Sequence, residues 1–150
     1  MDETIKRTIL ELLYLHRIMS VATVRPDGWP QATTVGFVNE GLSVYFLCGL
    51  DSQKAQNLAH DDRVSLTIND DPADIMQITG LSMAGHAQPV EDRAEAARIL
   101  ALMPLKYSDS PPLPMAMPTP DQVRIFCVTP SVISVIDYRK GFGHTDLVAA

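Results

Sequence analysis

Apolar side chains recur three and four positions apart over the first sixteen residues of this 150-residue chain. This period predicts a helix with one buried face. The apolar positions are Ile5, Ile9, Leu12 and Leu13. Asp2 stands near the expected start, where a negative charge complements the helix dipole.

After this helix the pattern becomes that of short strands joined by tight turns. Two turn sequences, Pro26-Asp27-Gly28 and Asn39-Glu40-Gly41, separate three runs rich in apolar and β-branched residues. Strands joined so closely predict an antiparallel meander. The three runs cover residues 18–25, 31–38 and 42–48.

The middle of the chain predicts a short helix and two more strands. Ser52 can cap a helix over residues 52–60, because its hydroxyl accepts a free backbone N–H. Strands are expected over residues 63–69 and 75–87. Two glycines inside the longer strand, Gly80 and Gly85, indicate a bulge or a sharp bend.

The last third begins with an alanine-rich helix, expected over residues 91–103. Six of the chain's eleven prolines follow within residues 104–120. Proline cannot continue a helix, so we expect a long loop there, either a lid or binding loop or a plain surface connection. Two strands, over residues 122–129 and 132–137, and an irregular tail complete the chain.

These elements predict a mainly β fold with peripheral helices. Strands do not alternate regularly with helices, which excludes a doubly wound parallel sheet. A six- to seven-stranded antiparallel barrel fits best. We expect residues 1–150 to form a single domain.

Composition narrows the function without naming it. Apolar side chains make up 46% of the chain and charged ones 20%, which suits a domain that needs no disulfide or metal to fold. The net charge of −6, with no basic block, argues against nucleic acid. The first residues are not a signal peptide, no stretch could span a membrane, and the two cysteines suit a reducing compartment. We therefore expect a cytoplasmic protein with no membrane association.

Familiar catalytic motifs are missing from the sequence. The four histidines have no Cys, Glu or second His at ligand spacing, so no metal site is predicted. There is no G-x-S-x-G elbow, P-loop or G-x-G-x-x-G fingerprint. No catalytic residue is assigned.

One local pattern favours phosphate binding. The apolar strand ending at Cys48 is followed by a short link, and Ser52-Gln53-Lys54 then opens a helix. A helix start offers free N–H groups and a partial positive charge, to which Ser52 and Lys54 add a hydroxyl and a cation. The plainer interpretation, a helix cap beside a surface lysine, stays open.

The order of these segments resembles the FMN-binding split-barrel proteins related to pyridoxamine 5′-phosphate oxidase. The resemblance covers residues 12–92 and resumes after residue 121. It implies a homodimer with FMN in two clefts between the protomers. The flavin would then carry two-electron transfer at N5 to or from a small molecule, and the protein would orient and shield it.

The resemblance also implies which residues bind the cofactor. The strand after the first turn would follow the isoalloxazine ring, the end of the third strand the ribityl chain, and the S-x-K helix start the phosphate. The partner's fifth strand would contribute to the cleft, and the last strand and tail would also reach it. The implied residues are Gln31, Thr33, Thr34, Val35, Leu47, Cys48, Ser52, Gln53, Lys54, Gln77, Tyr138 and Phe142.

The chain also departs from the vitamin B6 oxidases of that group. Those enzymes carry several late arginines and one in the second strand, whereas this tail has only Arg139, Lys140 and His144. Pyridoxamine phosphate is therefore not the expected substrate. Deazaflavin or haem in place of FMN, a module that stores or senses its cofactor without turnover, and a barrel serving only for interaction are the alternatives.

Overall fold

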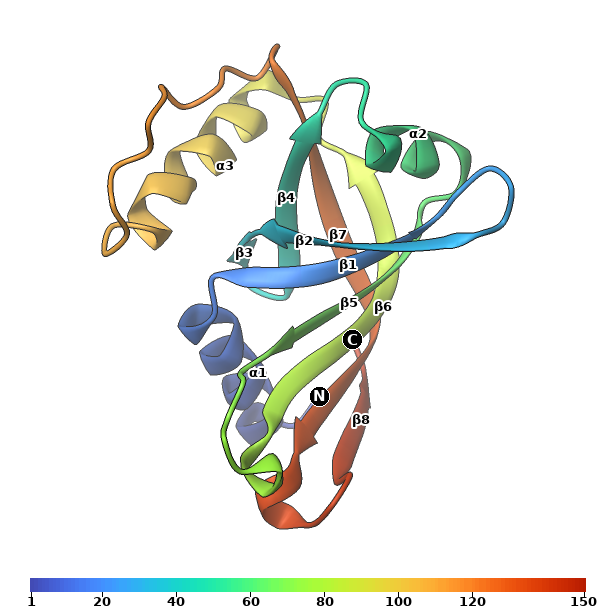
Figure 1. Cartoon of the computed structure of the whole chain (residues 1–150), viewed down its shortest axis with the longest axis vertical. Coiled ribbons are helices and arrows are strands. Elements are labelled where there is room, and N and C mark those ends of the chain that lie inside the picture. The colour runs from blue at the N-terminus through green and yellow to red at the C-terminus, as the bar shows by residue number, and fades with distance from the viewer.

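The computed structural model describes residues 1–150 as a curled sheet with helices around it (Figure 1). The strands are β1 (Ile18–Val24), β2 (Pro30–Gly36), β3 (Val38–Glu40), β4 (Ser43–Gly49), β5 (Arg63–Asn69), β6 (Thr79–Pro89), β7 (Val123–Asp137) and β8 (Thr145–Ala149). The helices are α1 (Glu3–Leu15), α2 (Gln53–His60) and α3 (Arg93–Lys106), with short 3-10 turns η1 (Ile75–Gln77) and η2 (Tyr138–Lys140).

All strand pairs are antiparallel, in the order β2-β1-β5-β6-β7-β4-β3, and β8 pairs with β7. The two ends of this order, β2 and β4 with β3, approach each other without pairing. This is the split barrel that the sequence predicted, with one strand more than the upper estimate. None of the helices is both long and apolar enough to cross a membrane.

The main core is formed by strand residues whose side chains alternate between buried and exposed. In β5 the side chains of Val64, Leu66 and Ile68 are buried, and the residues between them face outward. α1 covers this core with Ile9 and Leu13, both fully buried. This confirms the buried apolar face that the sequence predicted for the helix. Each such side chain stabilises the fold by about 1.5–3 kcal/mol through the hydrophobic effect.

A second, smaller core lies between α3 and the outer side of β4. It joins Ile99 and Met103 of α3 to Tyr45 of β4 and Val38 of β3. β4 therefore has apolar side chains on both of its faces, since Val44 and Phe46 belong to the main core. This explains why its sequence reads as an unbroken apolar run rather than an alternating one.

Two predicted strands near the end of the chain are one strand. β7 continues through Pro130, which lies opposite Gly85 where the register between β6 and β7 shifts. A proline has no N–H to donate, so a bulge is where a paired strand can accept one. The bulge expected in β6 from its glycines is confirmed at Gly85.

Other boundaries differ from expectation for similar local reasons. Helix α3 runs on through Pro104, which sits in the last turn and removes only one intrahelical hydrogen bond. The proline-rich loop therefore begins after Tyr107. The strand expected over residues 31–38 breaks at Phe37, whose N–H binds the Tyr107 hydroxyl at 2.9 Å. The tail is not irregular, because it forms η2 and β8.

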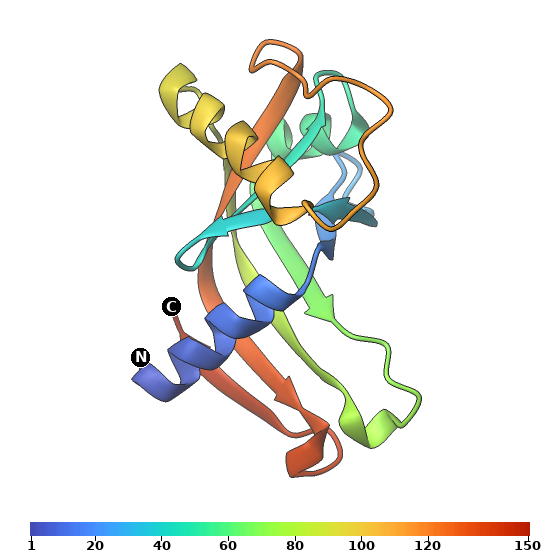
Figure 2. The ribbon, with the colours of Figure 1, turned by 90° about the vertical axis from the view of Figure 1, so that its left-hand side faces the viewer.

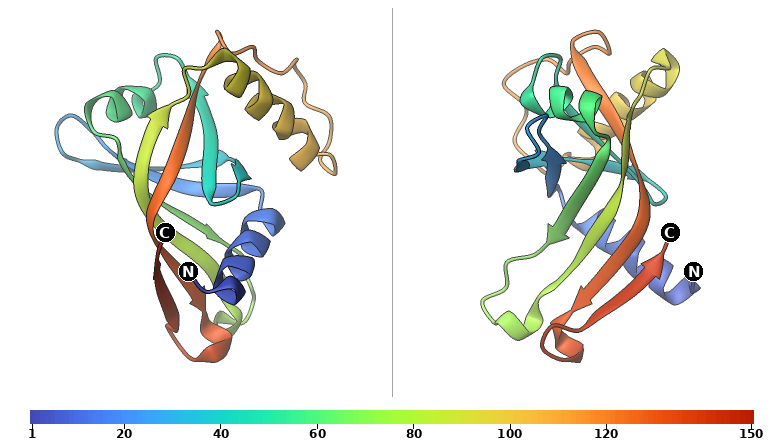
Figure 3. Two further views of the ribbon diagram at one scale, coloured as in Figure 1. Left: turned by 180° about the vertical axis from the view of Figure 1, so that it is seen from behind. Right: turned by 90° about the vertical axis from the view of Figure 1, so that its right-hand side faces the viewer.

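The molecule is elongated along β6 and β7 (Figures 1 and 3). At one end α2 lies beside the turn between β1 and β2. At the other end β6, β7 and β8 extend past the barrel to η1 and η2. The segment after α3 runs back beside that helix to the start of β7, as Figure 2 shows.

Candidate functional site

The start of α2 is joined to the edge strand β2 by a lysine. Lys54 donates from Nζ to Thr33 Oγ1 at 2.6 Å, and Ser52 Oγ accepts the N–H of Ala55 at 3.1 Å. β2 pairs only with β1, so the backbone groups on its other side are free. A hydroxyl, a cation, helix N–H groups and an open strand edge therefore lie together.

The two cations at this site, Lys54 and Arg124, form no salt bridge with a carboxylate. Lys54 is half-buried and Arg124 is exposed. Arg124 on β7 is the cross-strand partner of Cys48. Burial raises the pKa of the Cys48 thiol, while its hydrogen bond to Ser52 and the charges of Lys54 and Arg124 act against that rise. The donor set fits a phosphate monoester such as that of FMN.

A buried asparagine that sequence reasoning missed holds this arrangement in place. Asn57, with no exposed surface, donates to Thr23 Oγ1 at 2.9 Å and to Gln31 Oε1 at 3.0 Å. Its own carbonyl oxygen accepts from Gln53 at 2.8 Å. Asn57 thus ties Gln31 and Gln53 to each other. No local signal marks Asn57, because its partners Thr23 and Gln31 lie on strands β1 and β2.

The remaining residues expected at this end fall on two sides of their strands. Val35 and Cys48 pack against the main core, on the same side as Thr33. Leu47 packs instead into the smaller core beneath α3. Thr34 is exposed on the opposite face of β2, because side chains alternate along a strand.

The other three expected residues lie at the far end of the molecule. Gln77 is exposed in η1 and not within a strand, because the chain turns there before β6 begins. Tyr138 and Phe142 pack with ring centroids 5.4 Å apart, and Phe142 is 75% exposed. The Tyr138 N–H binds the Ile78 carbonyl at 2.9 Å, which joins η2 to the segment after η1. One chain therefore assembles two groups of expected residues at opposite ends (Figures 1 and 3).

The cations of the tail are already engaged. Arg139 binds Asp137 through two hydrogen bonds of 2.8 and 3.0 Å, which lowers the pKa of that carboxyl. His144 and Lys140 both lie against Asp146, at 3.3 and 3.7 Å. Arg139 and His144 are thus paired with carboxylates of their own segment.

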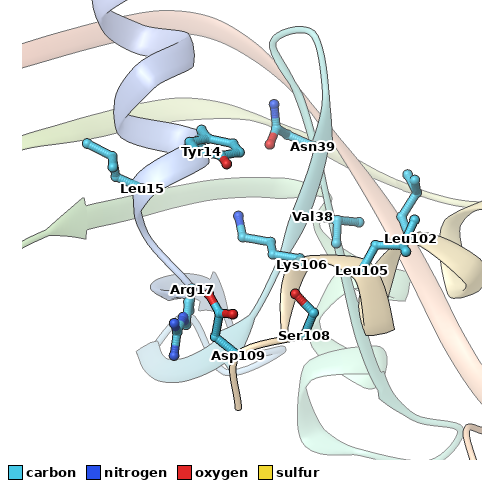
Figure 4. A pocket seen from close by; sticks show the side chains of 10 residues that line it. All are labelled: Tyr14, Leu15, Arg17, Val38, Asn39, Leu102, Leu105, Lys106, Ser108 and Asp109. Atoms are coloured by element: carbon cyan, nitrogen blue, oxygen red, sulfur yellow. The ribbon is translucent and has the colours of Figure 1, made fainter.

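A cavity of about 440 Å³ lies where α1, β3 and the end of α3 meet (Figure 4). Lys106 reaches into it, donating to the Leu13 carbonyl at 2.9 Å, with Nζ 3.6 Å from the centre of the Phe37 ring. Burial lowers the pKa of Lys106 to about 8. These contacts hold the last turn of α1, so the lysine has a structural use.

Comparisons with known proteins place the chain among related sequences. A family model described as pyridoxamine 5′-phosphate oxidase matches residues 5–137. No curated protein matches the chain.

Solved structures share the fold at low sequence identity. A conserved hypothetical protein of Mycobacterium tuberculosis is 24% identical, with a TM-score of 0.77 over 100% of this chain and 92% of that one. A Clostridium acetobutylicum protein of the pyridoxinephosphate oxidase family, related to general stress protein 26, is 16% identical, with a TM-score of 0.73 over 99% and 96%. A heme binding protein from Mycobacterium smegmatis is 20% identical, with a TM-score of 0.71 over 96% of this chain and 56% of that one.

Proposed function

The chain belongs to the pyridoxamine 5′-phosphate oxidase family, and from that membership we propose that it is an FMN-dependent oxidoreductase acting on a small molecule. The observation that carries the proposal is a pair of cations near the start of α2, Lys54 and Arg124, that form no salt bridge. Lys54 is half-buried without a carboxylate partner, and Arg124 lies across the strand pair from Cys48. A half-buried cation is costly unless an anion completes its environment, and the FMN phosphate is that anion.

The rest of the flavin would follow β2. The free backbone groups of this edge strand suit the ring's carbonyl and N–H edge. FMN supplies two-electron chemistry at N5 when it is bound. The residues of this chain bind and orient it: Lys54 and Ser52 at the phosphate, and Thr33 and Gln31 beside β2, held by Asn57.

We also propose that the working form is a homodimer. Gln77 lies in η1, Tyr138 lies in η2, and Phe142 packs on Tyr138. These turns are at the opposite end of the molecule from α2, so their residues reach a flavin only in a second copy. Phe142 exposes three-quarters of its surface, which a partner would cover. The cofactor would then lie between protomers, with α2 from one and the η1–η2 end from the other.

Pyridoxamine phosphate remains outside the proposal. Its phosphate would need free cations near the tail, and Arg139 and His144 there are bound to Asp137 and Asp146. Haem fits less well than FMN, although one protein of this fold is named for binding it. Of the two side chains near α2 that could ligate its iron, His60 is exposed at the end of the helix and the thiol pKa of Cys48 is raised by burial.

The test is cofactor uptake by the purified chain. Mass spectrometry of the ligand released from native protein should identify FMN, and reduced nicotinamide should bleach its spectrum. In an FMN titration, Lys54→Ala should raise Kd about tenfold or more, and Lys54→Arg should keep most of the affinity. Lys6→Ala, which removes a cation from α1, is the matched control.

Three results would overturn the proposal. They are a chain that takes up no flavin, a released ligand that is haem or deazaflavin, and an unchanged Kd in Lys54→Ala with circular dichroism like that of the wild type.

A further inference from the structure

A second cavity, of about 490 Å³, opens between the end of α3 and the loop that follows it. Its lining comprises three methionines, three prolines, two serines, one leucine and one tyrosine, with no charged residue among them. That volume lies within the usual range for small-molecule sites. Methionine side chains are flexible and polarisable, so they adapt to flat apolar ligands.

Two apolar side chains of this loop are left largely uncovered by the rest of the chain. Met115 is 72% exposed and Leu113 is 61% exposed. The Lys106 cavity on the other side of α3, by contrast, is lined by Lys106, Arg17 and Asp109 among others. The two cavities therefore differ in charge. Only the cavity between α3 and the loop, here called the loop cavity, suits an uncharged molecule.

Tyr107 connects the loop cavity to the end of β2. Its hydroxyl accepts the Phe37 N–H at 2.9 Å and donates to the Arg17 carbonyl at 2.6 Å. A Cβ on Gly36 would lie 2.6 Å from that hydroxyl, so the tyrosine packs directly on the last residue of β2. The wall of the cavity thus touches the strand along which the flavin ring is proposed to lie.

Two hydroxyls give the cavity its only polar side chains besides Tyr107. Ser110 Oγ accepts from Arg17 at 3.5 Å, which leaves its own proton free to donate. Ser108 is exposed beside it. Hydroxyl donors within an apolar lining suit a ring that bears carbonyl oxygens and no charge.

We propose that this cavity binds a neutral, planar quinone as the substrate of the flavin chemistry, a role that rests on the proposed function. Reduced nicotinamide would supply two electrons and a proton as hydride to the flavin. The quinone would take those two electrons and two protons, one of them from water, and leave as the hydroquinone.

Methionine methyl signals test the binding site directly. The chain labelled with ¹³C at the methionine methyl groups is titrated with duroquinone, whose ring positions are all substituted and cannot add a thiol. We expect shifts at Met103, Met115 and Met117 and none at Met19 and Met83, which lie in the main core. Anthraquinone-2-sulfonate, a planar anion, should leave the loop methionines unshifted.

Two variants of equal exposure supply the matched comparison. Met115→Glu and Leu105→Glu each replace an apolar side chain that is 72% exposed, the first in the loop cavity and the second in the Lys106 cavity. Met115→Glu should raise the duroquinone Kd about tenfold. Leu105→Glu should leave it within about twofold.

Several outcomes would overturn the quinone site. They are duroquinone shifts outside the loop methionines, equal effects of the two variants, and a change of oligomeric state in Met115→Glu, which would make the loop a contact between subunits. FMN titration separates this failure from that of the proposed function. If the chain binds FMN but duroquinone shifts no loop methionine signal, only the quinone site is refuted. A chain that binds duroquinone at the loop but takes no flavin keeps the binding site and loses the proposed chemistry.

Discussion

Lys54 and Lys106 are both half-buried and have no carboxylate partner, yet they serve different ends in this molecule. Lys106 is matched by groups of its own chain, the Leu13 carbonyl and the face of Phe37. Lys54 has only the Thr33 hydroxyl, and it lies beside free helix N–H groups that do not offset its charge. Lys106 therefore holds the fold together, whereas Lys54 remains available for the anion of the proposed function.

The pKa of Lys106 gives a pH dependence that can be measured. Because burial lowers it from 10.5 to about 8, the unfolded chain binds more protons between those values, and this group makes the unfolding free energy rise with pH across that window. Urea denaturation at several pH values should show wild-type stability, relative to Lys106→Met, increasing from pH 8 towards pH 10.5. A difference that does not change with pH would contradict the burial of this charge.

Local patterns predicted some residues of the candidate site and missed others. Ser52 and Lys54 could be predicted because a strand end, a cap and a helix start are adjacent in sequence. Asn57 could not, because its partners Thr23 and Gln31 come from strands about thirty residues away. Leu47 and Cys48 point to opposite sides of β4, one into each core. Which side packs beneath α3 could not be predicted without knowing where that helix lies.

At the scale of elements, the bend shared by β6 and β7 decides the shape of the sheet. Sequence reasoning read Gly85 correctly as a bulge but took Pro130 as the end of a strand. The two residues are cross-strand partners, and the missing side chain of Gly85 lets β7 approach β6 closely at Pro130. A Cβ on Gly85 would collide with the Thr129 carbonyl oxygen. The pairing joins residues 45 positions apart, which no local pattern reveals.

A pair of glycine variants tests this bend. Gly85→Ala should lower the unfolding free energy by about 2 kcal/mol or more, because the added methyl meets backbone that cannot move aside. Gly49→Ala is the control, since its Cβ would have Ser52 Cβ at 3.9 Å as the nearest atom and should cost less than about 1 kcal/mol. Equal losses in urea denaturation would show that the strands do not approach as closely as described.

At the scale of the whole molecule, the separation of the two residue groups is the main finding. The sequence allowed the prediction of a split barrel, since its turns and apolar runs are local signals. It did not show that β6, β7 and β8 extend beyond the barrel, because the tail reads as irregular. That extension places η1 and η2 far from α2, and a site built from both needs two chains.

Mixing two defective variants tests the shared site. Lys54→Ala damages the α2 half and Phe142→Asp the tail half, so neither alone should bind FMN at a concentration that fills the wild type. In a mixed dimer one site unites the two damaged halves and the other unites the two intact halves. Co-expression should therefore restore about a quarter of the wild-type FMN content. A mixture that binds no more than the separate variants would mean that each site lies within one chain.

The length of β7 has a consequence of its own. This strand carries Arg124 near one end and leads into Tyr138 at the other, a run of fifteen residues or roughly 50 Å. In the proposed dimer, the length of this strand would set how far one subunit extends across its partner. Lengthening it and β6 together by two residues would keep every side chain on its face and advance the tip by about 7 Å, whereas one residue would turn the outer half inside out. Among proteins with this fold, β6 and β7 should therefore differ in length by even numbers of residues.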